Sequence, residues 1–469
     1  MLGVPLFGAR SRALRCVNGA LIGSGFIIAA TGCATTAGGA ARESSLAVYD
    51  GSASQASRPA RDDAALGLHA AARERRAFVR AVLERNPTIQ SAWQGWRAAL
   101  ARVRQSSTFE DPMIDVGVAP LSIASSKAPF GYEIALSQHL SWFGKRGLEA
   151  SSAAAEADAI KSDYEAMRRE LALSAVVLYD QYFIAVRSLE INAHHVALMG
   201  AMRDEATAQF QAGRASAQDP LQAEAELAHM EHDTALLASQ RDVIVAQMNE
   251  LLHRAPELPL PPPPSELPLP TLPNARESAH LESDAVAHRT EITAARQRAH
   301  AAQARAERAD REYYPDVTLS TSYNSMWDMP EHRWMIGLGF NLPIQRGRRV
   351  GAADEALAMR AQFESDASRM TDAARTQVFV AFKQLQESEH VIGLFENRLL
   401  PIAREQVEAA SAGFIASQNP FMAVVAAEKN LRSVELDHQM ARAECDRHRA
   451  ELDRALGRIP GLDAQEDKP

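Results

Sequence analysis

Two histidines three positions apart, His229 and His232, have the spacing best suited to metal chemistry in this sequence. On a helix this spacing places both imidazoles on one face, where they could bind a cation. Such pairs on exposed helices are far more often ordinary surface residues than ligands. We therefore predict no metal site and no cofactor, and we keep His229 and His232 only as weak candidates.

A second group of soft side chains surrounds residues 326–335: Met326, Met329, His332 and Met335. Thioether sulfur suits Cu(I), but Met335 falls in a predicted strand, and ordinary loop residues are the favoured interpretation. The sequence contains no Gly-rich phosphate loop, no nucleophile elbow and no Cys or His cluster with structural metal spacing. We therefore predict that the protein is not an enzyme.

Acylation is the remaining chemistry that the sequence suggests, and it concerns Cys33. Arginines near the start precede an apolar stretch that is too short to span a membrane, which is typical of a signal peptide over residues 1–32. The stretch ends in Ala30-Thr31-Gly32-Cys33, which resembles the bacterial lipobox. We predict lipidation of Cys33 and an anchored tether over 33–72. An ordinary signal peptide cut near Ala34 is the alternative.

The overall composition excludes one large class of partner. The net charge is −9 and the basic residues are dispersed, which argues against nucleic acid. Aromatic residues make up only 6% of the chain, and alanine dominates the long proline-free stretches. Cys445 is the only other cysteine outside the predicted signal peptide, so the sequence predicts no disulfide within the mature chain.

The elements that must position any site are duplicated along the chain. The interval between Pro112 and Pro315 equals, to the residue, the interval between Gly144 and Gly347. Such a spacing indicates an internal repeat. We assign repeat 1 to residues 73–254 and repeat 2 to residues 278–458. A proline-rich connector over 255–277 separates them, and a polar tail follows over 459–469.

Each repeat is predicted to contain a helix too long for a compact domain. Residues 148–199 lack proline and glycine, and the pattern continues to Gln211, which gives a helix of ~95 Å. Its counterpart is expected over 352–412, with a kink at Pro401. The apolar seam of that second helix is interrupted at Glu389 and comprises Val378, Phe382, Leu385, Ile392, Phe395, Leu399 and Ile402. Returning helices are predicted over 221–252 and 421–456.

Four short segments alternate between apolar and small or polar residues, as half-buried strands do. Their lengths approach the ~9–11 residues of a tilted transmembrane strand. The residues that we expect to face lipid are Ile114, Val116, Ile134, Leu319, Ile336 and Leu338. Four strands cannot close a barrel, and open edges are not tolerated in lipid. Two chains would supply eight strands and three would supply twelve. A soluble sheet packed on the helices is the alternative.

Taken in order, these features resemble the TolC-like outer-membrane efflux family. The resemblance covers residues 73–458 and is carried by Asn86-Pro87, Tyr314-Pro315-Asp316, the turns at Gly144-Lys145-Arg146 and Gly347-Arg348-Arg349, and the helix reversal at 213–221. It implies a mainly α fold with a membrane β-barrel: a homotrimer with a twelve-stranded barrel and a helical periplasmic tunnel. It also implies a periplasmic adaptor protein and an inner-membrane pump of the RND type as partners.

The two helix reversals, 213–221 and 412–421, are expected at the periplasmic end of this tunnel. Gln218, Asp219, Gln418 and Asn419 are the candidates for lining or bracing a closed aperture. Asn419 departs from the acidic residue of the family pattern. The alternative is that Asp219 and Asn419 cap the returning helices.

The function predicted from these features is a passive exit duct in the outer membrane for small solutes. The turn Trp142–Arg146 looks like that of members found with heavy-metal exporters, which weakly favours metal cations as cargo. The alternative function is a lipid-anchored coiled-coil scaffold of the envelope that transports nothing.

Overall fold

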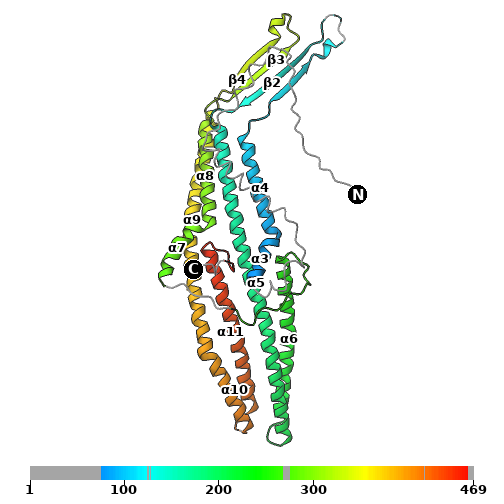
Figure 1. The fold of residues 1–469 in the computed structure, drawn as a ribbon, viewed down its shortest axis with the longest axis vertical. Coiled ribbons are helices and arrows are strands. Elements are labelled where there is room, and N and C mark those ends of the chain that lie inside the picture. The colour runs from blue at the N-terminus through cyan, green and yellow to red at the C-terminus, as the bar shows by residue number, and fades with distance from the viewer. Residues whose placement is uncertain (1–74, 124–125, 127, 268–274, 417, 463–469) are drawn as a thin grey trace, which may run out of the picture.

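The computed structural model describes residues 75–462, except 124–125, 127, 268–274 and 417. The molecule is long, with a sheet at one end and two helix tips at the other (Figure 1). Repeat 1 contributes α3 (Arg75–Arg85), α4 (Pro87–Ser107), β1 (Met113–Val118), η2 (Pro120–Ser122), β2 (Tyr132–Leu140), α5 (Lys145–Gln211) and α6 (Gln218–Leu251). Repeat 2 contributes α7 (Ala275–His288), α8 (Thr290–Arg311), β3 (Val317–Asn324), η3 (Pro330–His332), β4 (Trp334–Phe340), α9 (Arg346–Leu394), the π-helical turn η4 (Phe395–Leu399), α10 (Leu400–Ile415) and α11 (Phe421–Ala455).

The four strands form one antiparallel sheet in the order β1-β2-β3-β4. The central pairing, β2 with β3, joins the two repeats, and β1 and β4 are the outer strands. The strands contain 6, 9, 8 and 7 residues. Only β2 therefore reaches the length predicted from the alternating pattern; β1 ends at Val118, because the turn η2 follows closely.

The predicted long helices are present, and α5 alone has 67 residues, or ~100 Å at 1.5 Å per residue. Its counterpart is divided by η4 just before Pro401. The N–H of Leu400 donates to the carbonyl of Phe395, five residues earlier, and Pro401 has no N–H to continue the ladder. The predicted kink is thus a π-helical turn, which inserts one extra residue.

Two details of the predicted seam are wrong, and the first follows from that extra residue. Leu400 and Ala403 are buried after η4, whereas Ile402 is 48% exposed. Glu389 does not interrupt the seam, because it points outward and Ser388 takes the buried position, with its hydroxyl 2.7 Å from Nδ1 of His448.

The proline-rich connector lies as a strap across the helices, as its composition predicts. The amide of Asn249 donates to the carbonyls of Pro256 and Leu258 at 3.1 and 2.8 Å. The Tyr182 hydroxyl donates to Pro261 O at 3.1 Å. Leu267 is buried at the far end of the described part of the strap.

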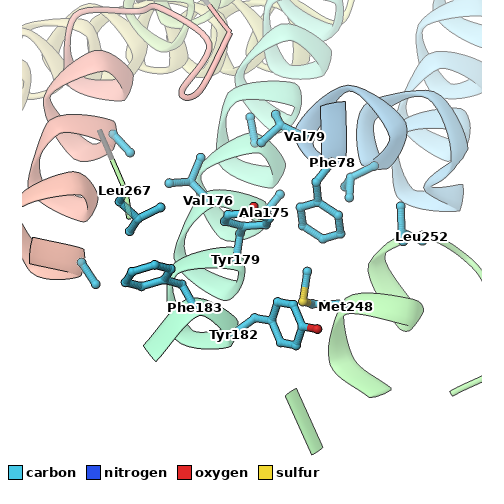
Figure 2. Packing of buried hydrophobic residues seen from close by; sticks show 14 residues of the cluster. Phe78, Val79, Ala175, Val176, Tyr179, Tyr182, Phe183, Met248, Leu252 and Leu267 are labelled. Atoms are coloured by element: carbon cyan, nitrogen blue, oxygen red, sulfur yellow. The ribbon is translucent and has the colours of Figure 1, made fainter. Parts of the chain in front are cut away.

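The largest core lies where α3, α5 and α6 meet this strap. Figure 2 shows Phe78 and Val79 of α3 facing Val176 and Tyr179 of α5. The rings of Phe78 and Tyr179 are 5.9 Å apart. The segment after Gly457 was expected to be a polar tail, but Ile459 and Leu462 pack against this core, and Arg76 donates to the Leu462 carbonyl at 2.7 Å.

Candidate functional site

One face of the sheet is apolar and the other is small or polar. Because residues opposite each other in the register share a face, the pairs Val116–Ile134, Ile134–Tyr323 and Leu319–Leu338 define one side. All six residues predicted to face lipid lie on it and are exposed in the single chain: Ile114, Val116, Ile134, Leu319, Ile336 and Leu338. The opposite side also carries two apolar residues, Met113 and Met335, but its other members are mainly small or polar: Asp115, Gly117, Glu133, Ala135, Ser137, Thr318, Ser320, Ser322, Gly337 and Gly339.

Aromatic rings border both ends of the apolar face. At the loop end, Tyr323 lies 5.8 Å from Tyr132 and 5.4 Å from Trp334, centroid to centroid. At the helix end, Trp142 stacks on Tyr314 at 5.8 Å and 5°. Sequence reasoning missed this second pair, although both residues belong to the repeated motifs that flank the strands.

The sheet meets the helices at a buried lysine. Lys145, the first residue of α5, is 3% exposed. Its Nζ lies 2.9 Å from Oδ1 of Asp316, which stands just before β3, and donates to the Tyr314 carbonyl at 3.0 Å. The same Oδ1 accepts from the backbone N–H of Trp142 at 2.8 Å. This cluster joins repeat 1 to repeat 2 where the strands change into helices.

The protonation of Asp316 follows from that environment. Burial acts to raise the pKa of its carboxyl, but the hydrogen bonds from the Trp142 N–H and the Lys145 ammonium outweigh burial and hold the pKa below its usual range. The carboxylate is therefore charged at neutral pH and pairs with the lysine. Sequence reasoning placed both residues in repeated motifs but did not identify them as partners.

The two repeated glycine turns differ in structure. Gly144 has φ +87°, a left-handed conformation that L side chains rarely adopt, and a Cβ there would also meet the guanidinium of Arg311. Glycine is required at this position. Gly347 instead lies inside the first turn of α9, with open space around it. The matching sequence motif thus has a strict backbone role only in repeat 1.

The two helix tips meet across a cleft of about 410 Å³. Asp219 lines it from the α5–α6 tip, and Gln418 and Asn419 line it from the α10–α11 tip. Gln218 is exposed beside the first tip. The structure therefore brings three of the four predicted tip residues to one cleft within a single chain.

The caps of the returning helices differ from those predicted. Asp219 lies within the first turn of α6, where its Oδ2 accepts from the N–H of Ser216 at 3.1 Å. The Ser216 hydroxyl in turn accepts from the N–H of Gln218 at 3.2 Å. This reciprocal pair is a capping box that a Ser-x-x-Asp search would have found. At the other tip, Pro420 precedes α11 without a side-chain cap, so the alternative in which Asn419 caps the helix does not hold.

The last candidates from the sequence are the histidine pair on α6 and Cys33. His229 and His232 are both exposed on α6, and the described residues contain no group of three or more His, Cys, Asp or Glu arranged for a metal ion. Cys33 lies outside the described residues. Among the described helices, none combines the length and apolarity needed to cross a membrane.

Comparison with known families decides the identity. The family model described as "Outer membrane efflux protein" matches residues 78–253 and 281–458, most of the chain. The chain belongs to the outer membrane efflux protein family. No curated protein matches it in sequence.

Solved structures share the fold of this outer membrane efflux protein. CusC superposes with a TM-score of 0.72 at 17% identity, covering 82% of this chain and 92% of CusC. VceC of Vibrio cholerae gives 0.68 at 18%, covering 81% and 95%. CmeC of Campylobacter jejuni, an outer membrane channel, gives 0.66 at 15%, covering 83% and 86%. The family resemblance inferred from the repeated motifs is confirmed, and the chain is an outer membrane efflux duct.

Proposed function

We propose that three copies of the chain combine their sheets into a twelve-stranded barrel, and that the helices continue it as a tunnel through the periplasm. The observation that carries this proposal is a four-stranded sheet whose outer strands, β1 and β4, have no strand beyond them in the described chain. Unpaired backbone groups cost several kcal/mol each in lipid, so each outer strand needs a partner from another copy.

The chemistry of the two sheet faces supports the same assembly. A barrel strand in a membrane alternates apolar residues toward lipid with polar residues toward the lumen. Ile336 is 83% exposed and Val116 is 69% exposed on the apolar side. The glycines and serines of the opposite side would line an aqueous passage without filling it.

The partners follow from the tips and from the family. We propose that a periplasmic adaptor protein docks at the cleft between the α5–α6 and α10–α11 tips and couples the duct to an inner-membrane pump of the RND type. In this proposal the duct itself is passive. Small solutes are the proposed cargo, and the Trp142–Arg146 turn favours heavy-metal cations.

We also propose that acylation of Cys33 tethers each copy to the inner leaflet of the outer membrane. Several acyl chains on one residue give stable anchoring, since burial of each methylene adds to the affinity.

Conductance measurements on the purified protein test the proposed duct. Purified full-length protein should run as a heat-modifiable trimer from outer-membrane fractions and should produce single-channel currents in planar bilayers. If the protein were a scaffold that transports nothing, the trimer would fractionate with the envelope and would conduct no current. Trimers without conductance would therefore overturn the duct.

A further inference from the structure

A layer of charged and amide side chains crosses the molecule above the helix tips. It connects the α5–α6 hairpin to α11 of the other hairpin, and we call it the cross-hairpin layer. Its members are Asn192, His195, Glu226, Asp233, Glu428, Lys429, Arg432 and Glu435. Apolar residues, including Met199, Leu227 and Val424, fill the space between this layer and the tips.

His195 is the centre of the layer. Its side chain is 1% exposed, and both ring nitrogens contact carboxylates of α11. Nδ1 pairs with Glu428, which is fully buried, and Nε2 lies 3.0 Å from Oε2 of Glu435. A neutral imidazole can donate from only one nitrogen. Two carboxylate partners therefore require the doubly protonated cation.

The other members complete the connection with further links. Lys429 reaches Glu226 of α6 at 2.6 Å. Arg432 lies 3.3 Å from Asp233 of α6 and donates to the amide oxygen of Asn192 at 3.1 Å.

The charges of this layer balance only when His195 is protonated. Lys429 and Arg432, with Arg404 of α10 3.7 Å from Glu435, supply three positive charges. The four carboxylates are Glu226, Asp233, Glu428 and Glu435. The exposed His194 is the remaining titratable neighbour on α5. Loss of the His195 proton would leave Glu428 as a buried charge without a cation, which is strongly unfavourable.

A helix discontinuity lies beside this layer. His438, one turn beyond Glu435 on α11, contacts η4: its Nε2 is 3.4 Å from Glu396, and its ring is 6.1 Å from that of Phe395. At η4 the helical ladder is broken, and the side-chain amide of Asn397 donates to the carbonyl of Gly393 at 2.8 Å. π-Helical turns of this kind often mark functional positions in helices.

We propose that His195 is a charged latch that fixes the α10–α11 hairpin to the α5–α6 hairpin, and that η4 is the hinge on which the hairpin end moves when the latch opens. The latch consists of the two ion pairs of His195, and the adjacent links of Lys429 and Arg432 keep the hairpins in register. Its role in opening the tunnel rests on the proposed function.

The latch depends on pH in a defined direction. Burial acts to lower the pKa of His195, but its hydrogen bonds and charge interactions with Glu428 and Glu435 outweigh burial and raise the pKa to about 9. A raised pKa stabilises the latched state fully below the free value of 6.5. The stabilisation declines as the pH rises from there and is lost above about 9. Alkaline conditions therefore open the latch.

Hydrogen exchange of the full-length protein in detergent tests this proposal. In His195→Gln, amides of α10 and the first half of α11 should exchange on the order of tenfold faster or more, because one buried partner is lost. Amides of α8 and the strands should be unchanged. His229→Gln, an exposed histidine on α6, is the matched control and should behave as wild type.

A second measurement keeps the proposal testable if that variant folds poorly. Wild-type protein compared at pH 6.5 and pH 9.5, after correction for intrinsic exchange rates, should show the same local increase. The doubly neutral His195→Gln, Glu428→Gln variant should lose this pH response. A uniform increase over the whole chain, or no change with pH in α10, would overturn the latch. Hydrogen exchange is measured independently of conductance. A failure of the latch in these experiments is therefore distinct from a failure of the proposed duct in planar bilayers.

Discussion

Lys145 is the residue that holds the junction between the strands and the helices. Replacement by Met would leave the Asp316 carboxylate without its cation at the junction of the two repeats. We expect a loss of roughly 3 kcal/mol or more, because half of a buried pair is removed. Thermal unfolding of the purified protein measures this.

Arg348→Met is the matched control, because Arg348 occupies the corresponding turn of repeat 2 and is exposed. It should have little effect. The Asp316 contribution is present at pH values above its unfolded pKa near 3.8 and is lost as the pH falls through the lower folded pKa. Equal stability losses for both variants at neutral pH would contradict this role of Lys145.

Asp219 is the residue that decides between a gate and a cap. Three copies near the axis of a trimer would create a negative potential that attracts cations. Asp219→Asn should then lower the cation selectivity of single channels, and Asn419→Ala should not.

Ser216→Ala separates the two roles, because it removes only the capping hydroxyl. It should cost ~1 kcal/mol of stability and leave selectivity unchanged. If Asp219→Asn likewise lowers stability and leaves selectivity unchanged, Asp219 acts as a cap and not as part of a gate.

At the scale of elements, two neighbouring positions of β4, Leu338 and Gly339, test which face of the sheet meets lipid. Leu338→Arg places a charge in the middle of β4 on the apolar face, and should cost ~2–4 kcal/mol in a membrane. Gly339→Ser lies on the opposite face, where a Cβ would meet Thr318 at an ordinary 3.6 Å. Trimer yield after membrane extraction should fall for the first variant only. A similar fall for both would count against the barrel.

The elements also show how far sequence reasoning reaches. Alternation in the strands and the long proline-free stretches were sufficient to predict the sheet faces and α5, since both patterns arise from local geometry. The exact seam after Phe395 was not predictable, because one inserted residue in η4 rotates everything beyond it. The different roles of Gly144 and Gly347 depend on the left-handed backbone at Gly144, which the shared motif does not reveal. The ion pairs of His195 join residues far apart in the sequence and left no periodic signal.

At the scale of the whole molecule, the proposed lipid anchoring depends on Cys33, which lies outside the described residues. Cys33→Ala should abolish incorporation of a palmitate analogue in growing cells. Cys445→Ala is the control, because that thiol is 3% exposed within the folded helices and should not accept a lipid. Palmitate label that persists in the Cys33→Ala variant would contradict acylation of Cys33.

The strand edges that each copy leaves open also determine how the protein is made. A single chain that has crossed the inner membrane carries an exposed apolar sheet with two unpaired edges, which is a template for aggregation. It cannot enter lipid alone, since only the closed barrel satisfies its backbone groups. For the proposed trimer, insertion is coupled to the meeting of three chains, and its rate should rise steeply with protomer concentration.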